Sequence, residues 1–136
     1  MKNLQVTGKE RECIVAIEEL KSNFPPRLSQ VAVKLGIKPP TAFVLVRQLE
    51  KKGLVEEAKG SIILTSRGKE VYKNIILAHR SLETLLCRAG IPLECACKEA
   101  EKIDYLIEPA YAKKLWQYLG KPKNCPHGRP VIPVSV

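Results

Sequence analysis

Apolar residues recur every three to four positions over most of the chain, which is typical of amphipathic helices. Residues 7–10, Thr-Gly-Lys-Glu, have the form of a capping box, and positions 13, 14, 17 and 20 are apolar. We therefore expect a first helix over about residues 8–23, ending before Pro25. A second helix is expected over residues 28–35, because Gly36 follows as a left-handed cap.

The next stretch predicts a third helix and a β-hairpin. Pro39 and Pro40 are tolerated in the first turn of a helix, and residues 41–52 carry one apolar stripe at positions 42, 45, 46 and 49. Gly53 ends this helix, and residues 55–64 have β-rich ends around Lys59 and Gly60. The order helix, turn, helix, hairpin predicts a winged helix-turn-helix.

Three more helices are expected after the hairpin, over about residues 66–90, 93–106 and 109–120. Proline and glycine dominate from Lys121 onward, so that tail is expected to be irregular. The predicted fold class is mainly α with a small β-hairpin wing. We expect two domains, a winged-helix DNA-binding domain over residues 1–73 and a helical metal-binding and dimerisation domain over residues 74–136, with the long helix shared between them.

Composition narrows the class of protein. With 136 residues, of which 45% are apolar, the chain has enough apolar surface for a compact core. The net charge of +9 favours a polyanionic partner. We expect a cytoplasmic protein with no membrane partner, because no apolar run is long enough for a membrane helix and the first residues form no signal-peptide core. Five cysteines, an odd number, argue against a disulfide framework.

The third helix would present its first turns to base edges in a DNA groove. Few of the exposed side chains there can donate two hydrogen bonds to one base, so we expect recognition by apolar contact and groove shape. Basic and polar residues around it would hold phosphates. The alternatives are a winged helix used for protein contact and an ordinary solvated basic face. The predicted base-facing residues are Lys38, Pro39, Pro40, Thr41, Val44 and Arg47, and the predicted phosphate contacts include Arg27, Ser29 and Lys59.

Helical spacing also predicts candidate metal ligands. His79 and Glu83 lie one turn apart, and Cys97, Glu101 and Asp104 share a face of the next helix. On the first helix, Glu12 is expected close to the apolar stripe, where a carboxylate is costly unless it is paired or binds an ion. Carboxylates with one imidazole suit manganese or ferrous iron, and a thiolate shifts the preference toward softer ions. The alternative is a set of ordinary surface ion pairs.

Other cysteines allow a different class of protein. Cys87, Cys95, Cys97, Cys125 and His127 would together supply the ligands of a structural zinc or a redox-sensing iron–sulfur site, although the spacing is uncommon. Cys13 is expected to be a small core residue. An enzyme acting on a small-molecule substrate is not expected, because the sequence contains no nucleophile motif, phosphate loop or catalytic dyad in a recognisable context.

Seven segments together resemble the landmarks of the diphtheria toxin repressor family of iron- and manganese-dependent repressors. They are RLSQVA at 27–32, KPPT at 38–41, LEKKGLV at 49–55, LTSRG at 64–68, HRSLE at 79–83, EAE at 99–101 and CPHGRP at 125–130. The resemblance implies a homodimeric repressor of a double-stranded DNA operator, of the short type without an SH3-like domain. It implies Fe²⁺ or Mn²⁺ as co-repressor, with Zn²⁺, Co²⁺ or Ni²⁺ next, linking the first helix to the dimerisation domain.

The resemblance also implies ligand positions. It places Glu12, His79, Glu101 and Asp104 at ligand positions, and Glu83 and Cys97 at a second, ancillary site. Two residues depart from the family pattern: Tyr105 stands where a histidine ligand is usual, and Val15 stands where the manganese branch has a second carboxylate. A metal-independent DNA-binding protein of the same fold is therefore a further hypothesis.

Overall fold

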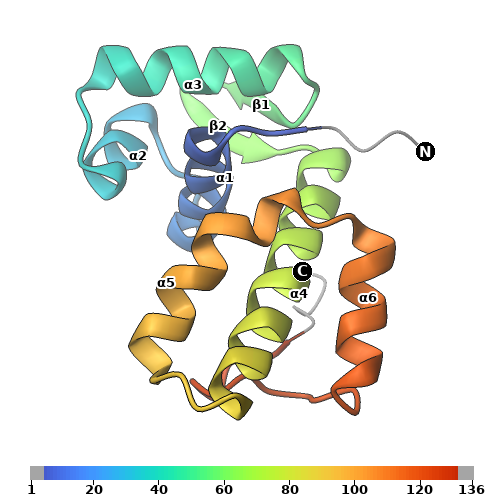
Figure 1. Ribbon diagram of the computed structural model, residues 1–136. Helices are drawn as coiled ribbons and strands as arrows, with labels where there is room; N and C mark the ends of the chain where they lie inside the picture. Colours follow the sequence, from blue (N-terminus) through green and yellow to red (C-terminus); the bar gives the residue numbers. More distant parts are fainter. Residues whose placement is uncertain (1–4, 132–136) are drawn as a thin grey trace. The chain divides into compact units, whose positions relative to one another are not determined.

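A computed structural model describes residues 5–131 of the chain. The described residues contain six α-helices, one short 3-10 helix and one two-stranded antiparallel sheet, so the predicted mainly α fold with a β-hairpin is confirmed (Figure 1). They form two compact units, one spanning Val6–Tyr72 (the N-terminal unit) and the other Gln5 with residues 73–131 (the C-terminal unit). No helix of this described part has the length and apolar character of a membrane span.

The N-terminal unit is built around α1 (Gly8–Leu20), which packs against α2 (Leu28–Leu35), α3 (Pro39–Lys51) and the second strand. The predicted capping box is present, because the Thr7 hydroxyl accepts from Glu10 N and the Glu10 carboxylate accepts from Thr7 N. The helix ends at Leu20, three residues before the predicted end. Phe24 precedes Pro25, which disfavours helical backbone there, and Ser22 N instead donates to Phe24 O.

The second helix has the predicted bounds, and the third begins with Pro39 and ends at Lys51, one residue before the predicted end. Gly36 has φ +67°, the left-handed conformation that a glycine adopts at low cost, and its N–H closes α2. Pro39 is the first residue of α3, where its missing N–H costs nothing. The predicted stripe Ala42, Leu45, Val46 and Leu49 is buried, so the opposite face of α3 is free for a partner.

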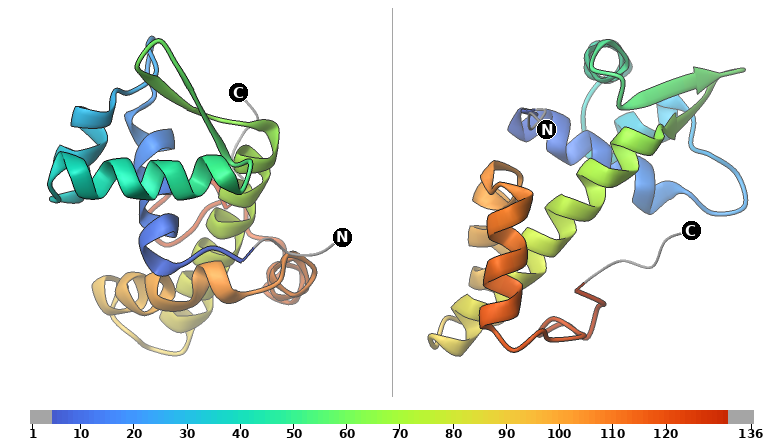
Figure 2. Two further views of the ribbon diagram at one scale, coloured as in Figure 1. Left: turned by 90° about the horizontal axis from the view of Figure 1, so that it is seen from above. Right: turned by 90° about the vertical axis from the view of Figure 1, so that its right-hand side faces the viewer.

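The wing is an antiparallel hairpin of β1 (Val55–Ala58) and β2 (Ser61–Leu64), which extends from the C-terminal end of α3 (Figure 2). Lys59 and Gly60 have φ +53° and +82°, as the tight turn of a two-residue hairpin loop requires. The preceding loop supports the hairpin: Ile62 N donates to Pro26 O at 2.8 Å, and the Arg27 guanidinium lies beside Gly60.

The C-terminal unit contains most of α4 (Ser66–Arg88), with α5 (Leu93–Ile103) and α6 (Pro109–Tyr118) along it (Figures 1 and 2). Close helix packing relies on small residues, since Ala96, Ala100 and Ala112 are completely buried. The predicted helix over residues 93–106 is shorter than expected, because its last turn tightens into a 3-10 helix at Asp104–Leu106.

The tail after α6 is irregular, as predicted, but residues 121–131 are held in place. The Trp116 indole N–H donates to Pro122 O at 3.0 Å, and the Arg80 guanidinium of α4 donates to Pro130 O. Cys125 and Val131 are buried. The tail is therefore part of the C-terminal unit, and it brings its side chains to α4.

Candidate functional site

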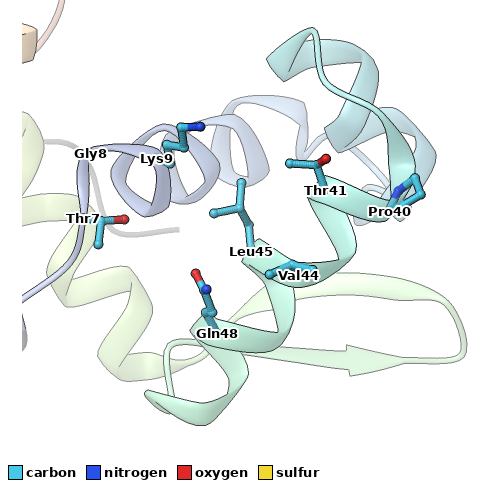
Figure 3. Close-up of a pocket in the computed structure, with 8 residues that line it drawn as sticks. All are labelled: Thr7, Gly8, Lys9, Pro40, Thr41, Val44, Leu45 and Gln48. Atoms are coloured by element: carbon cyan, nitrogen blue, oxygen red, sulfur yellow. The ribbon is translucent and has the colours of Figure 1, made fainter.

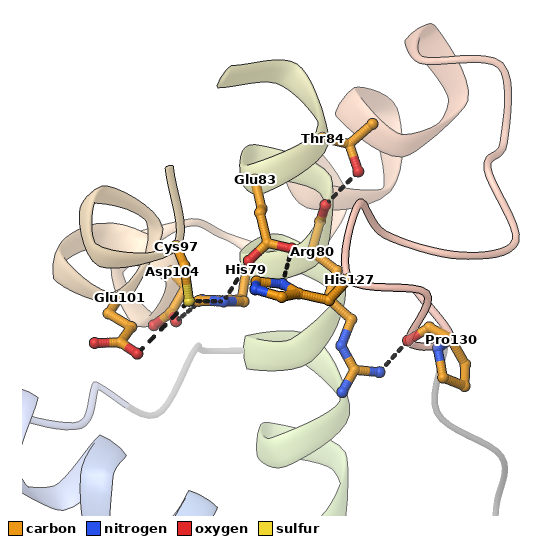
Figure 4. A network of polar contacts seen from close by, with 9 residues as sticks. All are labelled: His79, Arg80, Glu83, Thr84, Cys97, Glu101, Asp104, His127 and Pro130. Carbon is orange, nitrogen blue, oxygen red and sulfur yellow. Dashed lines mark hydrogen bonds and ion pairs between the residues drawn. The ribbon is translucent and has the colours of Figure 1, made fainter. Parts of the chain in front are cut away.

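Two helices of the C-terminal unit bring an imidazole, a carboxylate and a thiol together (Figure 4). His79 and Glu83 are one turn apart on α4, and His79 Nε2 lies 3.4 Å from Glu83 Oε2. Cys97 of α5 approaches from the side, with its Sγ 3.6 Å from His79 Nε2. The exposed fraction of Glu83 is only 1%. We call His79, Glu83 and Cys97 the first triad.

Asp104 fixes the orientation of this imidazole. Its Oδ2 lies 3.0 Å from His79 Nδ1, and the carboxylate is buried in the 3-10 helix that follows α5. An N–H on Nδ1 donates to the carboxylate and leaves the lone pair on Nε2, the nitrogen that faces Glu83 and Cys97. A carboxylate behind a histidine in this way is the common outer partner of metal-bound imidazoles.

The separations within the first triad fit a metal-binding site. Tetrahedral bonds of about 2.05 Å to nitrogen and oxygen and about 2.3 Å to sulfur place nitrogen and oxygen about 3.3 Å apart, and nitrogen and sulfur about 3.6 Å apart. The corresponding distances here are 3.4 and 3.6 Å. Moreover, the carboxylates of Glu83 and Asp104 are both buried beside His79, and a bound cation would offset their negative charge.

The thiol of Cys97 is protonated when no cation is bound. Burial raises its pKa to about 11, and the neighbouring carboxylates of Glu83 and Glu101 add to the increase. A cation that binds here displaces the thiol proton, because the thiolate is the metal ligand.

A second set of ligands shares Glu83. One ligand atom each of Glu83, Cys125 and His127 lie within 4.8 Å of one another, and His127 Nδ1 is 2.8 Å from Glu83 Oε1. Cys125 is buried and His127 is partly exposed. We call Glu83, Cys125 and His127 the second triad. Two of its members belong to the cysteine and histidine set that the sequence suggested as an alternative, but Glu83 takes the place of Cys87, Cys95 and Cys97.

The other predicted ligands lie outside the triads. Glu101 is exposed on α5, with Oε1 3.9 Å from Cys97 Sγ. Glu12, expected close to the apolar stripe of the first helix, is exposed on α1 of the N-terminal unit. Glu10 occupies the buried position instead, because Lys52 Nζ at 2.7 Å and the Thr7 N–H compensate its charge. Tyr105, at the usual histidine position, is half-buried.

The predicted DNA-binding residues are exposed on the N-terminal unit. Thr41, Val44 and Gln48 of α3 line one side of a hollow, and Thr7 and Lys9 at the start of α1 line another (Figure 3). The exposed residues comprise all nine that the sequence suggested: Arg27, Ser29, Lys38, Pro39, Pro40, Thr41, Val44, Arg47 and Lys59.

Sequence reasoning missed Phe43 on the same face of α3. Its side chain is 48% exposed, and the Arg47 guanidinium carbon lies 5.6 Å from the ring centroid. Such a cation–π contact holds the arginine over the ring. The available signal was the spacing itself, since Phe43 and Arg47 are four residues apart and outside the buried stripe.

Comparison with known proteins identifies a family for this chain. Residues 65–133 match the family model described as iron dependent repressor, metal binding and dimerisation domain. The chain is 32% identical over 108 residues to an uncharacterized HTH-type transcriptional regulator of Aeropyrum pernix, and 30% identical over 80 residues to the HTH-type transcriptional regulator MntR of Bacillus subtilis. The match to the Aeropyrum pernix protein covers 79% of this chain and 60% of that protein. The match to MntR covers 58% of this chain and 56% of that protein.

Solved structures share the fold. The crystal structure of the hypothetical protein SSo2273 from Sulfolobus solfataricus is 35% identical, with a TM-score of 0.80 over 95% of this chain and 100% of that one. A manganese-dependent transcriptional repressor in complex with manganese is 25% identical, with a TM-score of 0.75 over 96% of this chain and 63% of that one. The family match extends over the segment that carries both triads, and the chain therefore belongs to the iron dependent repressor family.

Proposed function

We propose that this protein is a DNA-binding transcriptional repressor whose affinity for its operator depends on a divalent metal. The observation that carries the proposal is the first triad, in which His79, Glu83 and Cys97 present three metal-binding atoms and Asp104 orients the imidazole. The winged helix with its exposed α3 supplies the surface for DNA. Residues 1–73 would act as the DNA-binding domain and residues 74–136 as the metal-binding and dimerisation domain.

Metal binding would act by shifting a population. A ligand changes an equilibrium only if it binds one state more tightly than the other. We propose that the metal favours the state in which two DNA-binding domains fit two half-sites, about one helical turn apart. The bound metal supplies positive charge that neutralises Glu83 and the Cys97 thiolate, while Asp104 keeps His79 in the coordinating tautomer.

The sequence also predicts Glu12 and Glu101 as ligands, and we retain both predictions. Glu101 is close enough to Cys97 for its carboxylate to join the first triad after a side-chain rotation. Glu12 is exposed and therefore accessible to an ion. A ligand on α1 would couple the metal to the DNA-binding domain, so Glu12→Gln is expected to weaken the DNA response more than Glu101→Gln does.

A homodimer is the expected assembly. Four large apolar side chains of the C-terminal unit are exposed and could be covered by a second copy of the chain. An operator with two similar half-sites matches a dimer with twofold symmetry. The exposed residues are Ile103, Leu106, Tyr111 and Tyr118.

The metal is expected to be a first-row divalent ion. Iron and manganese are the first candidates, since the sequence resembles repressors that respond to them. The thiol of Cys97 adds a soft ligand, which raises the affinity for Fe²⁺, Co²⁺ and Zn²⁺ relative to Mn²⁺. Measured affinities for the series of ions would rank them.

A DNA-binding assay tests the proposal. Double-stranded DNA with a randomised core is selected on the protein with Mn²⁺, Fe²⁺ or Zn²⁺ present, and the enriched sequence is used in mobility shifts with metal and with chelator. We expect metal to increase the affinity by about 5–150-fold, the usual range of coupling between two ligands. His79→Ala should abolish this increase but retain the weak binding seen in chelator.

The control is Glu94→Gln, which removes an exposed carboxylate of α5 outside both triads and should respond like the wild type. If wild-type protein binds the selected DNA equally in metal and in chelator, the chain is a metal-independent DNA-binding protein. If no sequence is enriched at all, the DNA-binding function itself is wrong.

A further inference from the structure

Glu83 belongs to both triads, and each of its oxygens faces a different one (Figure 4). Oε2 lies 3.4 Å from His79 Nε2, and Oε1 lies 2.8 Å from His127 Nδ1. The carboxylate is 1% exposed, and an ion bound between Oε1 and His127 would replace the hydrogen-bond contact that these two groups make. A carboxylate can bind one cation through each oxygen, and this one has an imidazole on both sides.

The two triads also have the same chemistry. Each combines one imidazole, one thiol and one oxygen of Glu83, and the second thiol, that of Cys125, is buried. Each set leaves one position of a tetrahedral ion for water or another ligand. Two thiolates and one carboxylate carry three negative charges, close to the charge of two divalent ions.

We propose that Glu83 joins the two triads into one centre that binds two thiolate-coordinated ions of the Zn²⁺ and Co²⁺ class, with the carboxylate as a ligand of both. His79 and Cys97 complete the site of one ion, and Cys125 and His127 that of the other. This inference rests on the proposed function, because the first triad is the metal site of that function. It adds a second ion whose site is linked to the first through a single side chain.

The tail after α6 would supply two ligands, Cys125 and His127, to the second ion. Residues 121–131 are irregular, and besides the burial of Cys125 and Val131 they are held by hydrogen bonds such as those from Trp116 and Arg80. An ion held by Cys125 and His127 on one side and by Glu83 of α4 on the other would cross-link the tail to α4. The C-terminal segment should therefore become protected from protease when the second ion binds.

Cobalt titration of the full chain tests the shared carboxylate. Co²⁺ reports thiolate coordination by its sulfur-to-metal absorption, and equilibrium dialysis followed by elemental analysis counts the ions. We expect two Co²⁺ per chain. Cys97→Ser should remove one ion and about half of the sulfur-to-metal absorption, Cys125→Ser should remove the other ion, and Zn²⁺ should displace both.

The variant Glu83→Gln distinguishes two ions that share one carboxylate from two ions bound at independent sites. This substitution should lower the affinity for each of the two ions. The expected decrease is roughly 10–100-fold or more, since loss of a supporting group at a metal site has an effect of this size. Cys95→Ser is the matched control, because it removes an exposed thiol of α5 that belongs to neither triad. Circular dichroism shows whether each variant folds, and His127→Ala provides a second variant of the tail site if Glu83→Gln does not fold.

Several outcomes would overturn the inference. One ion per chain with no effect of Cys125→Ser would leave the first triad, and with it the proposed function, intact while removing the second site. Two ions with Glu83→Gln affecting only one of them would show independent sites. If no ion binds at all, both the inference and the metal dependence of the proposed function are wrong. DNA binding is a separate question, which the mobility shifts answer.

Discussion

Asp104 illustrates how one buried residue sets the chemistry of another. Its carboxylate contacts His79 Nδ1 at 3.0 Å, while Nε2 faces Glu83 and Cys97. The charge of Asp104 also makes the imidazole a stronger electron donor. Asp104 is thus expected to act on the metal through His79 in this arrangement, although the sequence resemblance places it at a ligand position.

Asp104→Asn is predicted to weaken metal binding by about 10–100-fold without unfolding the protein, because the amide oxygen still accepts from Nδ1–H but carries no charge. Competition with a chromophoric chelator measures the change. Glu99→Gln is the control, since Glu99 forms an exposed ion pair with Lys102 outside both triads. Equal losses in the two variants would mean a nonspecific effect of charge.

At the same scale, the sequence predicted pairs within one helix but not pairs between segments. The i, i+4 spacing placed His79 beside Glu83, as the structure has them. It could not join His127 to Glu83, because these residues are 44 positions apart and the tail has no periodicity. On α1 the spacing favours Glu12 as the carboxylate near the apolar stripe, but Glu10 is the buried one. Its contacts with Thr7 and Lys52 lower the cost of burial, and a hydrophobic pattern does not reveal such contacts.

Helix α1 is tied to α3 by a charged contact. Glu10 caps the start of α1, and Lys52 Nζ, at the end of α3, lies 2.7 Å from its carboxylate. Burial raises the pKa of Glu10, but the Lys52 ammonium and the hydrogen bonds with Thr7 outweigh this, so the pKa is lowered from 4.5. The carboxylate form therefore stabilises the N-terminal unit.

Glu10→Gln is predicted to lower the free energy of unfolding at pH 7 by about 1–3 kcal/mol, the usual cost of breaking a charged buried hydrogen bond. The sign of the pH dependence follows from the lowered pKa. The stabilisation is present above pH 4.5 and is lost as pH falls through the pKa of folded Glu10, which lies below 4.5. Urea unfolding at several pH values should therefore show the two proteins converging in acid, whereas a constant difference would contradict the ionic origin.

The start of α4 depends on a glycine. A Cβ on Gly68 would collide with the Leu54 carbonyl oxygen and approach Leu64 Cβ to 3.3 Å. Backbone cannot move aside as a flexible side chain does, so Gly68→Ala is predicted to cost about 1–3 kcal/mol or more. Thermal unfolding measures it, with Glu70→Ala on the exposed side of α4 as control. An unchanged melting temperature for Gly68→Ala would contradict this packing.

Most elements could be predicted because their signals are local. Pro39 at the first turn of α3, Gly36 after α2 and the pair Lys59 and Gly60 in the hairpin each fix the backbone where they stand. The ends of helices without such a residue are set by tertiary contacts, which local sequence does not reveal. The helix that begins at Leu93 tightens at Asp104, where burial of that carboxylate against His79 is a tertiary effect.

Across the whole molecule, we expect the net charge of +9 to make the proposed DNA binding sensitive to salt. Lys59 at the wing tip is predicted to contact a phosphate. Lys59→Gln should weaken binding to all sequences alike and reduce the slope of log affinity against log salt by about 1. Fluorescence anisotropy over a range of salt concentrations measures the slope. Lys113→Gln, which removes an exposed charge from α6, is the control and should leave it unchanged.

Metal and DNA must affect each other's binding equally if one state of the protein favours both. The most direct test is the affinity for Zn²⁺ and for Mn²⁺ measured with and without saturating amounts of the selected DNA. We predict that DNA tightens metal binding by the same factor, about 5–150-fold, by which metal tightens DNA binding. A metal affinity that is identical with and without DNA would contradict a metal-dependent repressor.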